Sequence, residues 1–114
     1  MIPKVREKRK PHYELSRFKT LFQSEDTRFI TKQAHKGAVS QGYMAIEDIE
    51  GVIDKLCPHH FYKSMTTYEN YKVWQDVYKL TDEEKRLYIK IQFSVDEPKK
   101  AILIQMKKDE GSDE

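Results

Sequence analysis

The sequence lacks the features that cross-link a small protein, direct its export or anchor it in a membrane. Among its 114 residues is one cysteine, Cys57, which excludes an intramolecular disulfide and is compatible with a reducing compartment. No apolar run approaches the roughly 20 residues that span a bilayer. The basic N-terminus also lacks the apolar core of a secretory signal. We therefore expect a cytoplasmic protein without membrane contact.

Motifs of several enzyme classes are also missing. The chain has four glycines, and it contains no glycine-rich phosphate loop, no GxSxG and no HExxH. Nothing therefore supports a nucleoside triphosphatase or a serine hydrolase. The carboxylates gather at 47–50, at 82–84 and at the C-terminal end, in settings typical of solvated helix faces and turns. We interpret them as surface charge rather than as catalytic pairs.

Charge is present, but it is unevenly distributed. The net charge is +2, yet residues 1–23 carry seven Lys and Arg against two Glu, whereas 109–114 (DEGSDE) carry four carboxylates and no basic residue. This asymmetry indicates a polyanion or an acidic partner at one end, although two solvated, mobile ends explain it equally well. By length the chain is one domain, 1–114. We expect a mobile basic arm at 1–10 and a mobile acidic tail at 109–114.

The hydrophobic pattern predicts helices first and strands afterwards. Helical spacing of apolar residues predicts helices over 12–23 and 46–56, and Pro58 ends the second. Residues 28–43 are ambiguous, since Thr31 could cap a helix that Gly37 and Gly42 would interrupt.

Alternating apolar and polar residues predict strands over 87–95 and 101–107 that form a hairpin through 96–100. A further strand is expected over 72–80, followed by a polar turn at 81–86. The fold class is therefore α+β, a small antiparallel sheet with the helices packed on one face. The face that bears Leu87, Ile89, Ile91 and Phe93 should take the helices, and the other face should present Tyr88 and Lys90.

The segment Cys57-Pro58-His59-His60 is a possible metal site, but zinc needs three or four ligands in reach. No second cluster completes the set; we expect no metal and no cofactor. Adjacent histidines could also serve acid–base cleavage of RNA, but on a regular backbone they generally point in different directions. We interpret them as loop residues.

Aromatic residues, lysines and an amide concentrate in FYKSMTTYENYKVWQDVY (61–78). Lysines neutralise phosphates, and aromatic rings stack on the unpaired bases of single-stranded RNA. The same residues are common on open sheet faces and at protein interfaces. Physical reasoning alone therefore leaves two classes open, a nucleic-acid-binding protein and a protein-interaction domain. The candidate residues are Lys63, Gln75, Tyr88 and Lys107, with Tyr62, Tyr68, Tyr71, Trp74 and Tyr78.

The amino-acid sequences of several segments resemble those of the MqsR family of bacterial toxins. FYKSMTTY followed by WQDVY carries the resemblance, and EKRKPHYELSRFKTL, LYIKI and ILIQMK extend it over about residues 7–108. The resemblance implies a RelE-like α+β fold and an endoribonuclease that cleaves mRNA without the ribosome, preferentially at GCU. It also implies an MqsA-like antitoxin with a zinc-binding domain and a helix-turn-helix domain. DNA binding should come from that partner.

The family's functional positions fall on Lys63, Gln75, Tyr88 and Lys107. Strand alternation supports Tyr88 and Lys107, which point away from their apolar neighbours, whereas Gln75 shares its parity with Val73 and Val77 and would need a strand start or a bulge. We expect metal-independent attack of the 2′-hydroxyl, with phosphates held by Lys63 and Lys107 and with Tyr88 or one of those two lysines helping to remove the proton. Further RNA contacts are expected at Tyr62, Tyr68, Arg86, Lys90 and Lys108. Trp74, Phe61 and Met65 are expected to be structural.

Overall fold

The computed structural model describes residues 5–70 and 72–111, so Tyr71 and the last residues of the acidic tail lie outside it. The predicted α+β class is confirmed. The strands are β1 (Glu7–Lys8), β2 (Arg28–Ile30), β3 (Phe61–Thr66), β4 (Trp74–Asp82), β5 (Lys85–Phe93) and β6 (Ala101–Lys108). The helices are α1 (Leu15–Phe22), α2 (Lys32–Ser40) and α3 (Ile46–Lys55), with single 3-10 turns at Glu25–Thr27 and Pro58–His60. No helix in these ranges is long and apolar enough to cross a membrane.

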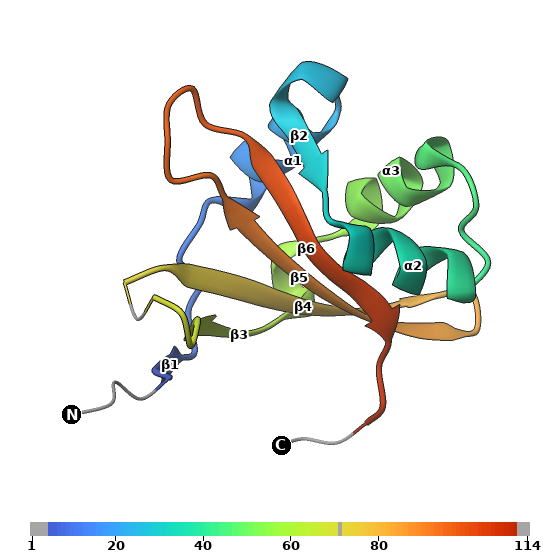
Figure 1. The fold of residues 1–114 in the computed structure, drawn as a ribbon. Coiled ribbons are helices and arrows are strands. Elements are labelled where there is room, and N and C mark those ends of the chain that lie inside the picture. Colours follow the sequence, from blue (N-terminus) through green and yellow to red (C-terminus); the bar gives the residue numbers. More distant parts are fainter. Residues whose placement is uncertain (1–4, 71, 112–114) are drawn as a thin grey trace.

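The strands form one sheet in the order β1-β3-β4-β5-β6-β2. Neighbours are antiparallel except β2 and β6, which are parallel. The antiparallel meander predicted for the second half of the chain is confirmed as β4-β5-β6. Figure 1 shows α1, α2 and α3 gathered on one side of this sheet, and no helix of the described residues covers its other side.

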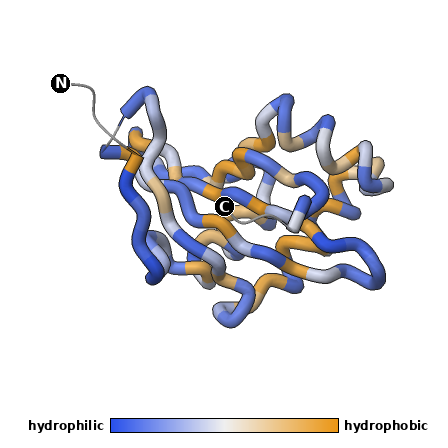
Figure 2. Tube along the Cα trace, turned by 90° about the horizontal axis from the view of Figure 1, so that it is seen from below, coloured by the Kyte–Doolittle hydropathy of each residue, from blue (hydrophilic) through white to orange (hydrophobic). Residues whose placement is uncertain are grey.

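Strand alternation determines which side chains meet the helices. In β5, Leu87, Ile89 and Ile91 are fully buried and Phe93 nearly so, while the residues between them are partly exposed. Hydrophobic and hydrophilic residues alternate along the strands in Figure 2. The core forms between this face and the helices, which contribute Phe18 and Phe22 from α1 and Ile49, Val52 and Ile53 from α3. Such burial is the main stabilising term for a chain of this size.

The ambiguous region 28–43 becomes strand β2 followed by helix α2. The Thr31 hydroxyl accepts a hydrogen bond from the Ala34 backbone at 3.0 Å, so the predicted cap is confirmed. Gly37 does not interrupt the helix, which continues to Ser40. Glycine fits this position because α2 touches β6 there: a Cβ would be 2.0 Å from the carbonyl oxygen of Met106. Gly42 follows the helix end with a φ of +97°, a conformation that favours glycine.

Several predicted boundaries need correction. The helix expected over 12–23 begins at Leu15, because the carboxylate of Asp76 accepts hydrogen bonds from the backbone of His12 and Tyr13 and holds that segment against β4. The turn expected at 81–86 is shorter, since β4 continues to Asp82 and β5 begins at Lys85. Segments 7–8, 28–30 and 61–66 are strands that the pattern did not predict. The N-terminal arm is therefore attached to the sheet at Glu7–Lys8.

Trp74 is the first residue of β4, half-buried and outside the main core. Its ring stacks on His12 with centroids 5.5 Å apart, and the Lys8 ammonium lies 4.3 Å from its centroid. It anchors the segment that precedes α1. Phe61 packs against the core as expected.

Candidate functional site

The side of the sheet without helices, here called the open face, carries a group of lysines and tyrosines. Directly paired residues on neighbouring strands share a face. One row across the sheet consists of Lys63, Val77, Lys90 and Gln105, and the next row consists of Lys79, Tyr88 and Lys107. The rows bring together four ammonium groups from the four consecutive strands β3, β4, β5 and β6.

A hollow of about 270 Å³ lies on this face, here called the open-face hollow. A register shift between Phe61 and Lys63 marks a bulge in β3, and it lets Tyr62 and Lys63 point to the same side. The Lys79 ammonium lies 4.0 Å from the centre of the Tyr62 ring, and that of Lys107 lies 5.0 Å from the centre of the Tyr88 ring. The lining residues are Tyr62, Lys63, Met65, Lys79, Tyr88, Lys107, Asp109 and Glu110.

Carboxylates partly balance the lysines of this hollow. Lys63 is 9% exposed, and its ammonium donates to a carboxylate oxygen of Glu7 at 2.8 Å. That hydrogen bond is the main reason why the pKa of Glu7 lies below its ordinary value. Lys79 pairs with Asp109 at 3.4 Å. A phosphate oxygen has the charge and acceptor geometry to replace either carboxylate oxygen.

Unlike Lys63 and Lys79, Lys90 has no carboxylate partner among the described residues. It is half-buried in the centre of the open face, flanked by Val77 and Gln105. Burial lowers the pKa of Lys90, and the charges of Lys107 and Lys63 lower it further. A lysine in such surroundings loses its proton more readily and can act as a base.

The structure places the other predicted residues at different distances from the open-face hollow. Gln75 lies on the open face but outside the lining, and its amide donates to the side-chain oxygen of Gln92 at 2.8 Å. Arg86 is exposed at the start of β5 with the parity of Tyr88. Lys108 pairs with Leu87 and therefore points to the opposite face. Tyr68 lies in the β3–β4 loop, 83% exposed and away from the hollow.

The Cys57–His60 segment forms a turn after α3. The Nδ1 atom of His60 accepts a hydrogen bond from the Cys57 backbone at 2.9 Å, and the rings of His59 and His60 lie 4.1 Å apart. Neither histidine lines the open-face hollow. Across residues 5–70 and 72–111, no group of three His, Cys, Asp or Glu side chains is placed to hold a metal ion.

Comparison with known proteins identifies the family. The model of the family described as "Motility quorum-sensing regulator, toxin of MqsA" matches residues 10–108. The chain belongs to the MqsR toxin family. The mRNA interferase toxin MqsR of Escherichia coli (strain K12) is 39% identical over 85 residues, which cover 75% of this chain and 85% of that protein. The resemblance seen in the sequence is confirmed, and both matches support the predicted class, an endoribonuclease toxin.

Other residues of the site in this MqsR-family chain escaped the sequence analysis. Lys79 lines the open-face hollow and shares the parity of Gln75 in KVWQDVYKL, so strand alternation could have indicated it. Glu7 could not be found this way, because only the pairing of β1 with β3 brings it to Lys63. Met65, expected to be structural, lines the hollow as well.

Proposed function

We propose that the chain is the toxin of a toxin–antitoxin pair and a ribosome-independent endoribonuclease that cleaves single-stranded mRNA, with a preference for GCU. Family membership and the E. coli relative support this activity. The observation that carries the assignment of the site is the meeting of Lys63, Tyr88 and Lys107 around one hollow on a sheet face without helices. A cationic groove with aromatic side chains suits single-stranded RNA.

In this proposal the RNA lies across the open face and needs no metal. Lys63 and Lys107 hold the scissile phosphate, and Lys90, in its neutral form, removes the proton of the 2′-hydroxyl. The 2′-oxygen attacks phosphorus in line and the bond to the 5′-oxygen breaks, which gives a 2′,3′-cyclic phosphate and a 5′-hydroxyl. A neighbouring ammonium, that of Lys107 or Lys63, supplies the proton of the leaving oxygen. The Tyr88 hydroxyl orients the phosphate, and the cations stabilise the charge that develops on it.

Gln75 has a different place in the proposal. Its amide is held by Gln92 on the open face, along the course that the RNA would follow. We assign it to positioning a nucleotide next to the cleaved bond.

We further propose that an MqsA-like antitoxin, with a zinc-binding domain and a helix-turn-helix domain, neutralises the protein in the cytoplasm. The family's own description names MqsA as the partner. A non-catalytic RNA-binding or protein-interaction domain is the alternative, and it would use the same surface without cutting RNA.

The test is cleavage of a purified long mRNA in EDTA, with the cut ends mapped. The wild type should cut at a short recurring motif and leave 5′-hydroxyl ends, and Lys63→Gln and Lys107→Gln should lose the activity. Lys36→Gln, at an exposed position of α2, is the matched control and should cut normally. Thermal unfolding of each variant separates lost chemistry from lost folding. Intact RNA with the folded, antitoxin-free wild type would favour the non-catalytic alternative.

A further inference from the structure

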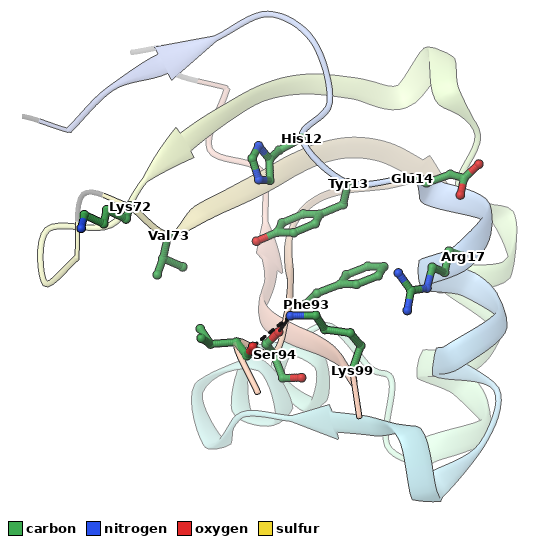
Figure 3. A pocket seen from close by; sticks show the side chains of 10 residues that line it. His12, Tyr13, Glu14, Arg17, Lys72, Val73, Phe93, Ser94 and Lys99 are labelled. Atoms are coloured by element: carbon green, nitrogen blue, oxygen red, sulfur yellow. Dashed lines mark hydrogen bonds between the residues drawn. The ribbon is translucent and has the colours of Figure 1, made fainter. Parts of the chain in front are cut away.

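A second and larger hollow lies away from the open-face hollow. It measures about 430 Å³, within the range of small-molecule sites. Its lining includes Tyr13, Arg17, Lys72, Phe93, Ser94 and Lys99. Figure 3 shows Tyr13, Arg17, Phe93 and Lys99 close together, from the segment before α1, from α1 itself and from the end of the sheet, while Lys72 extends away from them. We call it the rim hollow.

The floor of the rim hollow is well fixed. The rings of Tyr13 and Phe93 stack in parallel with centroids 4.9 Å apart, and the Tyr13 hydroxyl donates to the Trp74 carbonyl oxygen at 2.7 Å. The Lys99 ammonium donates to the carbonyl oxygens of Ser94 and Val95 at 3.1 and 2.9 Å. The hollow is therefore built by the buried ring of Phe93, the half-buried ring of Tyr13 and hydrogen-bonded groups.

The walls of the rim hollow are mainly cationic. Arg17, Lys72 and Lys99 line it against a single carboxylate, that of Glu14. Glu97 approaches Lys99 at 3.7 Å but is itself 75% exposed. The Arg17 guanidinium lies 5.3 Å from the centre of the Phe93 ring, which holds it at the edge of the hollow. This combination of charge and rigid shape suits an anion such as a phosphodiester.

The rim hollow, which Phe93 lines from the helix-covered side of the sheet, lies where β5 reaches the end of the open face. Tyr88, Lys90 and Gln92 follow one another on that face, and β5 ends at Phe93, directly before Ser94 of the rim hollow. At about 3.3 Å per residue, Tyr88 and Ser94 are about 20 Å apart. A few nucleotides of extended single-stranded RNA bridge such a distance. Between the two hollows, polar contacts are offered by Lys90 and by the Gln75–Gln92 pair.

We propose that the rim hollow is a second RNA subsite, which binds a phosphodiester and its nucleotide a few positions from the bond that is cut. The proposal rests on the function proposed above and adds to it a determinant of substrate length. RNA is favoured over the antitoxin as occupant because the cationic walls suit a phosphodiester, and because β5 leads from Tyr88 on the open face to Ser94 at the hollow. The subsite lowers the KM for long RNA and leaves the chemical step unchanged.

The experiment compares a short RNA that contains only the cleavage motif with RNAs extended by several nucleotides at the 5′ or the 3′ end. Arg17 is exposed, so Arg17→Glu should fold normally. It should raise the Kd of one extended RNA about tenfold and reduce the salt dependence of its binding by about one counterion. The short RNA should bind and be cut as by the wild type. Lys36→Glu, with the same charge change on α2, is the control for long-range electrostatics.

Several results would overturn the proposal. Equal binding of extended RNA by wild type and Arg17→Glu would show that the rim hollow does not contact RNA. Equal losses in Arg17→Glu and Lys36→Glu would reduce the effect to overall charge. Normal RNA binding with weakened inhibition by the antitoxin would assign the hollow to that partner. A wild type that leaves even the short RNA intact would instead refute the proposed function.

Discussion

Lys90 shows how the chemistry of a residue depends on neighbours that the sequence does not reveal. Strand alternation predicted that it shares a face with Tyr88, and the structure confirms this. Its burial and its closeness to Lys63 and Lys107 arise only when β3, β5 and β6 come together in one sheet. The lowered pKa of Lys90 has these tertiary causes, and for that reason the sequence indicated only a phosphate contact.

Lys90→Arg should abolish most of the cleavage while RNA binding persists. Arginine keeps the positive charge but cannot give up its proton in proteins, so the loss of a general base should lower kcat by about 10²–10⁴-fold. In the wild type, kcat/KM should rise with pH as Lys90 loses its proton and level off below the ordinary lysine pKa of 10.5. Single-turnover cleavage across pH, together with filter binding, measures both effects.

The groups around Lys90 set the controls for this profile. Lys63, Lys79, Tyr88 and Lys107 share the open face with Lys90, and the carboxylates of Glu7 and Asp109 pair with Lys63 and Lys79. Lys79→Arg is the matched variant, because Lys79 lines the open-face hollow without a role in proton transfer, and it should keep the rising limb. If Lys90→Arg cleaves RNA at the wild-type rate and with the wild-type pH dependence, Lys90 is a phosphate contact and not the base.

Gln75 illustrates a second limit at the residue scale. Its shared parity with Val77 spoke against a place on the open face, because a buried valine normally marks the core side. Val77 is fully buried, yet it lies on the open face between Lys63 and Lys90 and outside the main core. Long lysine stems can cover apolar surface in this way. The alternation itself was correct, because Val77 shares the open face with Gln75.

Among the elements, the contact of α2 with β6 tests the packing of the helical layer. Gly37→Ala should destabilise the protein, because the new Cβ would meet the Met106 carbonyl oxygen at 2.0 Å; overpacking of this kind costs about 1–3 kcal/mol. Gly51→Ala in α3 is the matched control, since nothing lies within 4 Å of its Cβ and alanine favours the helix by up to about 1 kcal/mol. Urea unfolding should therefore shift in opposite directions. A Gly37→Ala variant as stable as the wild type would contradict the close contact.

The contact between α2 and β6 also shows which elements the hydrophobic pattern of the sequence could predict and which it could not. Helix α3 and strands β5 and β6 bury regular apolar stripes, so their period revealed them. Helix α2 buries only Ala34 and Ala38 and uses a glycine to approach β6, a pattern that looks like an interrupted helix. Strands β1 and β2 are short edge strands without a period of their own. Their positions depend on partners elsewhere in the chain.

At the scale of the whole molecule, the fold separates stability from the candidate function. The helices and the core occupy one side of the sheet, so the other side is available for lysines and tyrosines. The α+β fold class and the sheet face that the helices cover could be predicted from the order of the elements and from the spacing of their apolar residues. The hollows could not be predicted, because each combines residues that are distant in the sequence, from His12 to Lys99 in the rim hollow and from Tyr62 to Glu110 in the open-face hollow. Residues from the N-terminal segment and the start of the acidic tail complete these surfaces.

The acidic tail should compete with RNA for the open-face hollow. Asp109 and Glu110 line it, and the Asp109 backbone is held by the Arg86 carbonyl oxygen at 2.8 Å. The variant Asp109→Asn/Glu110→Gln removes two negative charges without shortening the chain. It should bind RNA several-fold more tightly at low salt, and the gain should fade as salt screens the charges. Titration of a fluorescent RNA at several salt concentrations measures the difference.

The control must separate a local effect from the change in net charge. Glu47→Gln/Asp54→Asn alters the charge equally at two exposed positions of α3, on the side of the sheet away from the open face. If the tail screens the lysines locally, only the Asp109→Asn/Glu110→Gln variant should gain affinity, because exposed charges act weakly beyond about 10 Å at moderate salt. Equal gains in both variants would leave the tail with no local role. A loss of affinity in the Asp109→Asn/Glu110→Gln variant would instead mean that Asp109 holds Lys79 in the position that contacts RNA.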